Sequence, residues 1–128
     1  MPSYLLDTHT LIWLSSERKR FGSRVKRILD SQQLNYCAIS VAELGLKSHL
    51  GKFHFDLSVL GDWESLGIRE LSFGRLAAIE YGSINPDIVR DPFDRMIMSC
   101  ARANGLILLT ADQQILNYGA DWIIDATT

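Results

Sequence analysis

The chain has 128 residues, of which 47% are hydrophobic and 22% are charged, and its formal net charge is −2. This length and balance predict one globular domain, residues 1–128, and exclude a disordered or fibrous protein. No apolar run approaches the roughly 20 residues of a membrane-spanning helix, and "MPSYLLDTHT" lacks the basic and apolar segments of a signal peptide. We therefore expect a cytoplasmic protein in which Cys37 and Cys100 are buried free thiols.

Short apolar runs alternate along the chain with segments of helical periodicity. In chain order we predict a strand at 3–7, helices at 9–16 and 22–33, a strand at 35–39, helices at 40–52 and 57–66, a strand at 68–71, helices at 74–82 and 92–104, a strand at 106–110, a helix at 112–118 and a strand at 122–125. This alternation predicts an α/β fold, a three-layer α/β/α sandwich around a mainly parallel sheet of four to five strands.

Basic residues are concentrated in one short segment. Positions 18–27 hold six of the thirteen Lys and Arg residues. A solvated helix face is the plainer interpretation. The alternative is a patch that attracts phosphates or an acidic partner, and this segment is the candidate track for RNA.

Four acidic residues are expected at one edge of the sheet. Asp7 follows the first strand and Asp112 follows the fourth. Glu43 is predicted in the first turn of the helix that leaves the second strand, and Asp94 in the first turn of the helix that enters the fourth. Open α/β sheets bind ligands beyond the carboxyl ends of their strands, so these carboxylates are expected to converge on a site.

Each acid also has a structural interpretation. Asp7, Asp91 and Asp112 are suited to cap helices, and Ser40 with Glu43 fits a capping box. Clustered carboxylates nevertheless repel one another unless a cation neutralises them. Mg²⁺ and Mn²⁺ prefer such oxygen ligands and can activate a water for phosphodiester hydrolysis.

Other chemistries are less favoured. No G-x-S-x-G, P-loop or G-x-G-x-x-G motif is present, so no covalent nucleophile is evident. A haloacid-dehalogenase-like phosphatase needs a second aspartate two positions after the first, and that position is His9, predicted on a helix surface. A non-catalytic module that binds RNA or protein and a DNA-cleaving nuclease of related architecture remain as alternatives.

Four segments together resemble the PIN-domain ribonucleases, and most of all the VapC-type toxins of bacterial toxin–antitoxin pairs. They are "LLDTHTLIW", "ISVAELGLKSHLGK", "DPFDRMIMSCARANGLILLTAD" and "ILNYGADWIIDA". The resemblance implies a PIN-like fold whose metal-binding and catalytic acids are Asp7, Glu43, Asp94 and Asp112. Thr110 corresponds to a hydroxyl residue near the last acid.

The resemblance further implies a metal-dependent endoribonuclease that uses Mg²⁺ or Mn²⁺, cleaves RNA, forms a homodimer and is inhibited by a cognate antitoxin. We expect Lys47 to form an ion pair with Glu43. Arg95 is expected to pair with a neighbouring acid, with contact to a substrate phosphate as the alternative. Trp13 is expected in the core or an interface rather than as a platform for bases.

Overall fold

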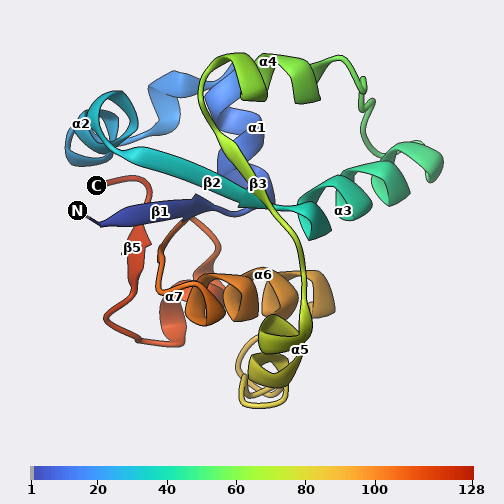
Figure 1. Ribbon diagram of the computed structural model, residues 1–128, viewed down its shortest axis with the longest axis vertical. Coiled ribbons are helices and arrows are strands. Elements are labelled where there is room, and N and C mark those ends of the chain that lie inside the picture. The colour runs from blue at the N-terminus through green and yellow to red at the C-terminus, as the bar shows by residue number, and fades with distance from the viewer. Residues whose placement is uncertain (1) are drawn as a thin grey trace.

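A parallel five-stranded sheet forms the centre of the protein, whose computed structural model describes residues 2–128 (Figure 1). The strands are β1 (Ser3–Leu6), β2 (Gln33–Cys37), β3 (Arg69–Leu71), β4 (Ile107–Thr110) and β5 (Ile123–Asp125). Their order in the sheet is β3-β2-β1-β4-β5, and every neighbouring pair is parallel. The predicted α/β fold with a mainly parallel sheet is therefore confirmed.

The connections between the strands are helical, as the sequence predicts. The helices are α1 (Thr8–Ser16), α2 (Ser23–Ser31), α3 (Ala38–His49), α4 (Val59–Ser65), α5 (Arg75–Tyr81), α6 (Pro92–Ala103) and α7 (Gln113–Asn117), with a 3₁₀ turn η1 at Arg18–Arg20. Each predicted element is present with shifted ends. Within residues 2–128, no helix has the length and apolar character needed to cross a membrane.

The two faces of the sheet support separate cores, which gives the three predicted layers. On β1, Leu6 belongs to the cluster formed with α1, α2 and α4, whereas its neighbour Leu5 belongs to the cluster formed with α5, α6 and α7. Leu109 and Leu108 divide in the same way on β4. Strands buried on both faces need continuous apolar runs, because successive side chains point to opposite faces.

Helix α6 has the terminal residues that its sequence predicts. The Asp91 carboxylate accepts hydrogen bonds from the backbone N–H groups of Phe93 (2.7 Å) and Asp94 (3.4 Å), and Pro92 takes the first helical position. Gly105 follows the helix with a φ of 63°, the left-handed conformation typical of that position. Asp91 is thus confirmed as the helix cap.

Helix α3 begins two residues earlier than predicted, and the capping box was wrong. Its N-cap is Cys37, at the end of β2, so Glu43 lies in the second turn of the helix rather than the first. Ser40 and Glu43 instead turn inward towards Thr8, whose Oγ1 lies 3.0 Å from Ser40 Oγ and donates to Glu43 Oε1 at 2.6 Å. Buried polar groups need such partners, and the tertiary contact replaces the local one.

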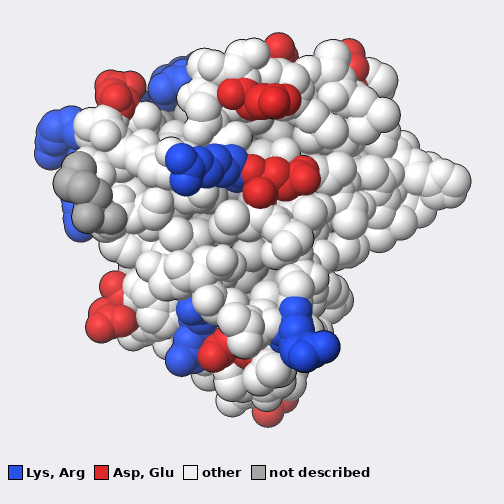
Figure 2. All heavy atoms as spheres, in the orientation of Figure 1, with Lys and Arg blue, Asp and Glu red and all other residues white. Residues whose placement is uncertain are grey.

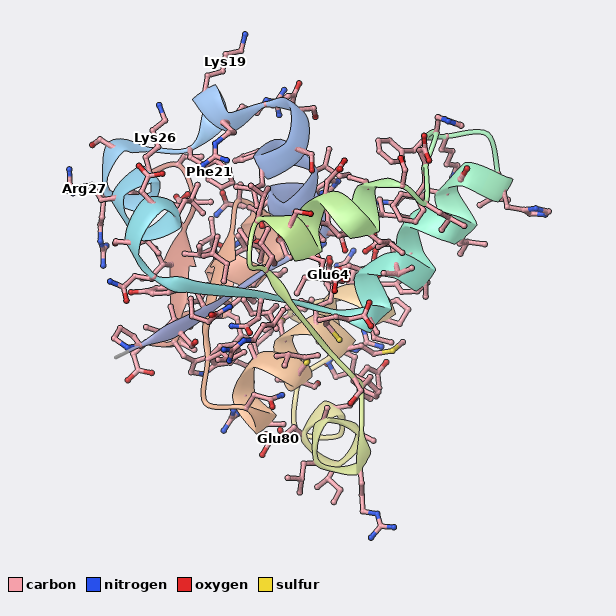
Figure 3. All side chains as sticks on the ribbon, turned by 45° about the horizontal axis from the view of Figure 1, so that its top comes forward. Lys19, Phe21, Lys26, Arg27, Glu64 and Glu80 are labelled. Atoms are coloured by element: carbon pink, nitrogen blue, oxygen red, sulfur yellow. The ribbon has the colours of Figure 1, made fainter. Side chains whose placement is uncertain are left out.

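The basic segment is divided between η1 and α2, and its six cationic side chains are exposed. In Figure 1, α2 lies beside the N-terminus, whereas α3 leaves the opposite end of the sheet. Lys19, Lys26 and Arg27 project outward there (Figure 3), and Figure 2 shows Lys and Arg atoms gathered at the same end. The segment is a solvated surface, which both the plainer interpretation and the phosphate-binding alternative require.

Cys37 and Cys100 are buried free cysteines, as predicted. Both belong to the core cluster on the α6 side of the sheet.

Candidate functional site

Asp7 is almost completely buried where β1 ends and α1 begins. Its Oδ1 accepts hydrogen bonds from the Thr10 backbone N–H (3.0 Å) and the Thr10 hydroxyl (2.7 Å). Its Oδ2 accepts from the hydroxyl of Thr110, at the end of β4. Burial raises the pKa of the Asp7 carboxyl, and the bonds from Thr110 and Thr10 oppose that effect.

Glu43 is only 5% exposed and is held by two side chains from different elements. Its Oε1 accepts from the Thr8 hydroxyl at the start of α1, and its Oε2 lies 3.0 Å from Lys47 Nζ, one turn further along α3. The predicted Glu43–Lys47 ion pair is confirmed. Together, Thr8 and Lys47 give both oxygens of this buried carboxylate a polar partner and fix its position beside α1.

Asp112 is the N-cap of α7. Its Oδ1 accepts from the backbone N–H groups of Gln114 (2.9 Å) and Ile115 (3.1 Å). Its own N–H donates to Thr110 Oγ1 at 3.0 Å. Because the same Thr110 hydroxyl donates to Asp7, one buried residue connects the two acids that follow β1 and β4.

Asp94, in the first turn of α6, is the acid on which the others converge. No hydrogen bond to its carboxylate is found within residues 2–128. Burial raises its pKa, and so do the neighbouring charges of Asp91, Asp112, Asp7 and Glu43, to about 8. The other three predicted site acids therefore lie within electrostatic range of Asp94, as expected of residues at one edge of the sheet.

Access from solvent is unequal among the acids. An open hollow of about 530 Å³ is bounded in part by Asp94 and Asp112, together with Arg90 and Gln114. Asp7 and Glu43, at 2% and 5% exposure, are far less accessible to solvent. A ligand that enters the hollow meets Asp94 and Asp112 directly.

Arg95 does not form the ion pair that the sequence suggested. Its Nη1 donates to the carbonyl oxygens of Val89 (2.9 Å) and Arg90 (2.7 Å), and its Nη2 donates to the Tyr81 hydroxyl (2.8 Å). None of the ion pairs within residues 2–128 includes it. Three fixed donors suit a guanidinium to this task, so Arg95 holds the loop before α6 rather than a site acid.

The donor chemistry of the site fits a hard divalent cation, but the carboxylates are not yet arranged around one. Four acids provide only oxygen ligands, which Mg²⁺ and Mn²⁺ prefer. Burial and the repulsion of neighbouring acids raise the pKa of Asp94, and a bound cation would relieve that repulsion. Across residues 2–128, no three acidic, histidine or cysteine side chains are spaced to hold a metal ion. Ion binding would therefore require these side chains to move.

The sequence prediction missed the threonines that position the acids. Thr8 and Thr10 directly follow Asp7 in "LLDTHT", and both are buried with their hydroxyls on carboxylates. Thr110 lies near the last acid as expected, since its Oγ1 accepts from the Asp112 N–H at 3.0 Å, and its hydroxyl also donates to Asp7. The available signal was the group of hydroxyl residues at the ends of two neighbouring buried strands.

Comparison with known proteins gives four consistent matches. A model of the PIN domain matches residues 4–120. "Ribonuclease VapC22" of Mycobacterium tuberculosis (strain ATCC 25618 / H37Rv) is 25% identical over 121 residues, which cover 92% of this chain and 93% of that protein. DNA-bound VapBC from Salmonella typhimurium has a TM-score of 0.70 at 24% identity, covering 98% of each chain. A toxin–antitoxin complex from Klebsiella pneumoniae has a TM-score of 0.69 at 17% identity, covering 96% of this chain and 97% of that one.

Proposed function

This chain belongs to the PIN domain family, and on that premise we propose that it is a metal-dependent endoribonuclease, the toxin of a type II toxin–antitoxin pair. The observation that supports the proposal best is the convergence of acids on Asp94, whose pKa is raised to about 8 by burial and by the charges of Asp91, Asp112, Asp7 and Glu43. The curated relative is named a ribonuclease, and two similar structures are complexes of the VapBC or toxin–antitoxin type.

The four acids have unequal roles in this proposal. Asp94 and Asp112 line the open hollow and would bind the cation from the solvent side. Asp7 would complete the site from within the fold, held by Thr10 and Thr110. The bound ion would supply a more acidic water and positive charge opposite the scissile phosphate.

Glu43 is suited to orient the attacking water or to complete the set of ligands. Thr8 and Lys47 hold its two oxygens, so the carboxylate keeps a fixed position although it is buried. Hydrolysis by water does not use the 2′-hydroxyl of RNA. The products should therefore carry 5′-phosphate and 3′-hydroxyl ends.

The proposed partners are an RNA substrate, a cognate antitoxin and a second copy of the chain. The antitoxin is supported by the VapBC and toxin–antitoxin complexes among the similar structures. Mg²⁺ or Mn²⁺ is the proposed cofactor, since both accept a site made only of carboxylates.

Cleavage of a broad RNA pool by purified protein tests the activity. We expect cutting with Mg²⁺ or Mn²⁺, none with EDTA, and none by a folded Asp94→Asn variant. Mapping of the product ends tests the mechanism, and 2′,3′-cyclic phosphate ends would contradict it. Asp87→Asn makes the same substitution in an exposed loop and serves as the control for charge and folding.

The alternative function is that of a non-catalytic PIN-fold module. One observation speaks for it: no three side chains in residues 2–128 are already at metal-binding spacing. Calorimetric titration with Mg²⁺ or Mn²⁺ separates the two functions. Saturable binding that Asp94→Asn weakens supports the nuclease. Absence of binding at millimolar metal supports the module.

A further inference from the structure

A hollow of about 520 Å³ between α1 and the end of α3 combines basic and aromatic side chains. The residues that matter here are His9, Trp13, Arg20, Lys47, Lys52 and Phe53. His9 and Trp13 are four positions apart on α1, and therefore share one face of that helix. Lys47 and Lys52 approach from α3 and the turn that follows it.

This basic-aromatic hollow has two walls, one on α3 and one on α1, and both lie next to the carboxylate edge. On the α3 side, Lys47 Nζ lies 3.0 Å from Glu43 Oε2. On the α1 side, His9 immediately follows Thr8, the residue that donates to the same Glu43 carboxylate. The hollow is therefore one of the surfaces next to the acids over which an RNA strand can extend from the scissile phosphate.

The charge of the hollow is suited to phosphate. Three cations and one acid, Glu17, line it. Arg20 Nε lies 3.1 Å from Glu17 in an exposed pair, which is weak in water. Lys52 takes part in none of the ion pairs found in residues 2–128. Both Arg20 and Lys52 are thus able to turn towards an anion.

The aromatic side chains supply the second element of single-strand recognition. Trp13 and Phe53 are only half-buried, and the Arg20 guanidinium lies 5.3 Å from the centre of the Trp13 ring. Proteins bind single-stranded nucleic acid by stacking bases on such rings while cations follow the backbone. The 18–27 segment as a whole has more cations, but Phe21, its aromatic residue, is buried in the core.

We propose that the basic-aromatic hollow binds single-stranded RNA next to the scissile phosphate, with a base against Trp13 and phosphates on Arg20 and Lys52. The proposal rests on the proposed function, because it takes the four acids as the cleavage site. It places the RNA track on α1 and α3, and not on the 18–27 segment as a whole.

Binding is measured in EDTA, so that cleavage plays no part. The probe is a fluorescein-labelled, unstructured RNA of about twelve nucleotides, within the usual size range of such sites, and its anisotropy is followed at several salt concentrations. Arg20→Gln/Lys52→Gln should weaken binding and reduce the salt slope by about 1.4, since each phosphate contact in a single strand contributes about 0.7. Lys26→Gln/Arg27→Gln removes the same charge from α2 and should leave the slope unchanged.

Trp13 is tested by a graded pair of variants. Trp13→Leu should weaken RNA binding by roughly 5- to 150-fold, the loss expected for one stacked base. Trp13→Phe retains an aromatic face and should keep most of the affinity. Thermal unfolding of both variants shows whether they are folded, because Trp13 also packs edge-on against Phe21.

Three outcomes would overturn the assignment. The first is an unchanged slope in Arg20→Gln/Lys52→Gln with a reduced slope in the α2 control, which would move the track to α2. The second is equal binding by Trp13→Leu and Trp13→Phe. The third is that the variants of the hollow bind RNA as wild type does but lose a protein that co-purifies with wild type. That result would make the hollow a protein-docking surface. Wild-type protein that binds RNA through the hollow yet cuts none with Mg²⁺ or Mn²⁺ would overturn the proposed function and support RNA binding by the hollow without a cleavage site beside it.

Discussion

Thr8 Oγ1 donates a hydrogen bond to Glu43 Oε1 over 2.6 Å, and so joins the first residue of α1 to the second turn of α3. The two residues are 35 positions apart in the chain. Both are buried, and the same threonine oxygen lies 3.0 Å from Ser40 Oγ. This contact decides where one of the four site acids points.

Thr8→Val is therefore expected to harm both stability and activity. The substitution keeps the shape but leaves a buried carboxylate oxygen without its donor, which costs about 1–3 kcal/mol. Urea unfolding gives the stability change, and initial rates of RNA cleavage give the activity. Thr127→Val also removes a hydroxyl–carboxylate hydrogen bond, but an exposed one. The prediction is wrong if the two variants lose equally little stability.

Asp91 and Asp112 both cap helices, but only Asp112 is a proposed metal ligand, so variants of the two separate a structural role from a chemical one. Asparagine caps a helix about as well as aspartate, so Asp91→Asn and Asp112→Asn should both keep their helices. We expect Asp112→Asn to abolish metal-dependent cleavage, because it removes a proposed ligand. Asp91→Asn should keep most of the activity. Circular dichroism checks the fold, and equal activity of the two variants would contradict the assignment of Asp112.

Metal-free protein should become less stable as the pH rises from about 4 to about 8. The pKa of Asp94 is raised to about 8 in the folded protein, against about 3.9 in an unfolded chain. The folded state therefore binds this proton more tightly, and the free energy of unfolding falls across that window. Burial raises the pKa of Asp7 as well, which acts in the same direction.

Asp94→Asn should make this decline smaller, so that the variant gains stability over wild type as the pH increases in EDTA. Saturating Mg²⁺ at pH 8 should raise the melting temperature of wild type more than that of the variant. Thermal unfolding in EDTA and in Mg²⁺, from pH 5 to pH 9, checks both expectations. Parallel curves for the two proteins at every pH would show that Asp94 is not the titrating group.

Arg95→Lys should loosen the loop before α6 without reducing the attraction for RNA. A lysine cannot replace three guanidinium contacts, to the carbonyl oxygens of Val89 and Arg90 and to the Tyr81 hydroxyl. We expect a loss of about 1–3 kcal/mol in unfolding free energy. The affinity for RNA and the salt slope of binding should both stay at the wild-type values. If the Arg95 guanidinium instead contacted a substrate phosphate, Arg95→Lys would lower the affinity for RNA.

Much of the fold can be predicted from the sequence because its signals are local. Continuous apolar runs such as "LILLT" specify strands buried on both faces, and the Asp91-Pro92 and Gly105 pair marks the two ends of α6. Alternation of strands and helices then leads to a parallel sheet. That topology in turn predicts which edge of the sheet holds the acids.

The tertiary structure alone decided how Glu43 is held and which groups Arg95 contacts. Sequence spacing favoured a local capping box for Glu43, but burial against α1 gave it Thr8 as a partner from another element. Arg95 likewise exchanged a nearby acid for the carbonyl oxygens of a loop. A buried polar group takes whichever donor or acceptor the packed fold brings to it. Such partners come from distant positions in the chain, so spacing along the sequence does not reveal them.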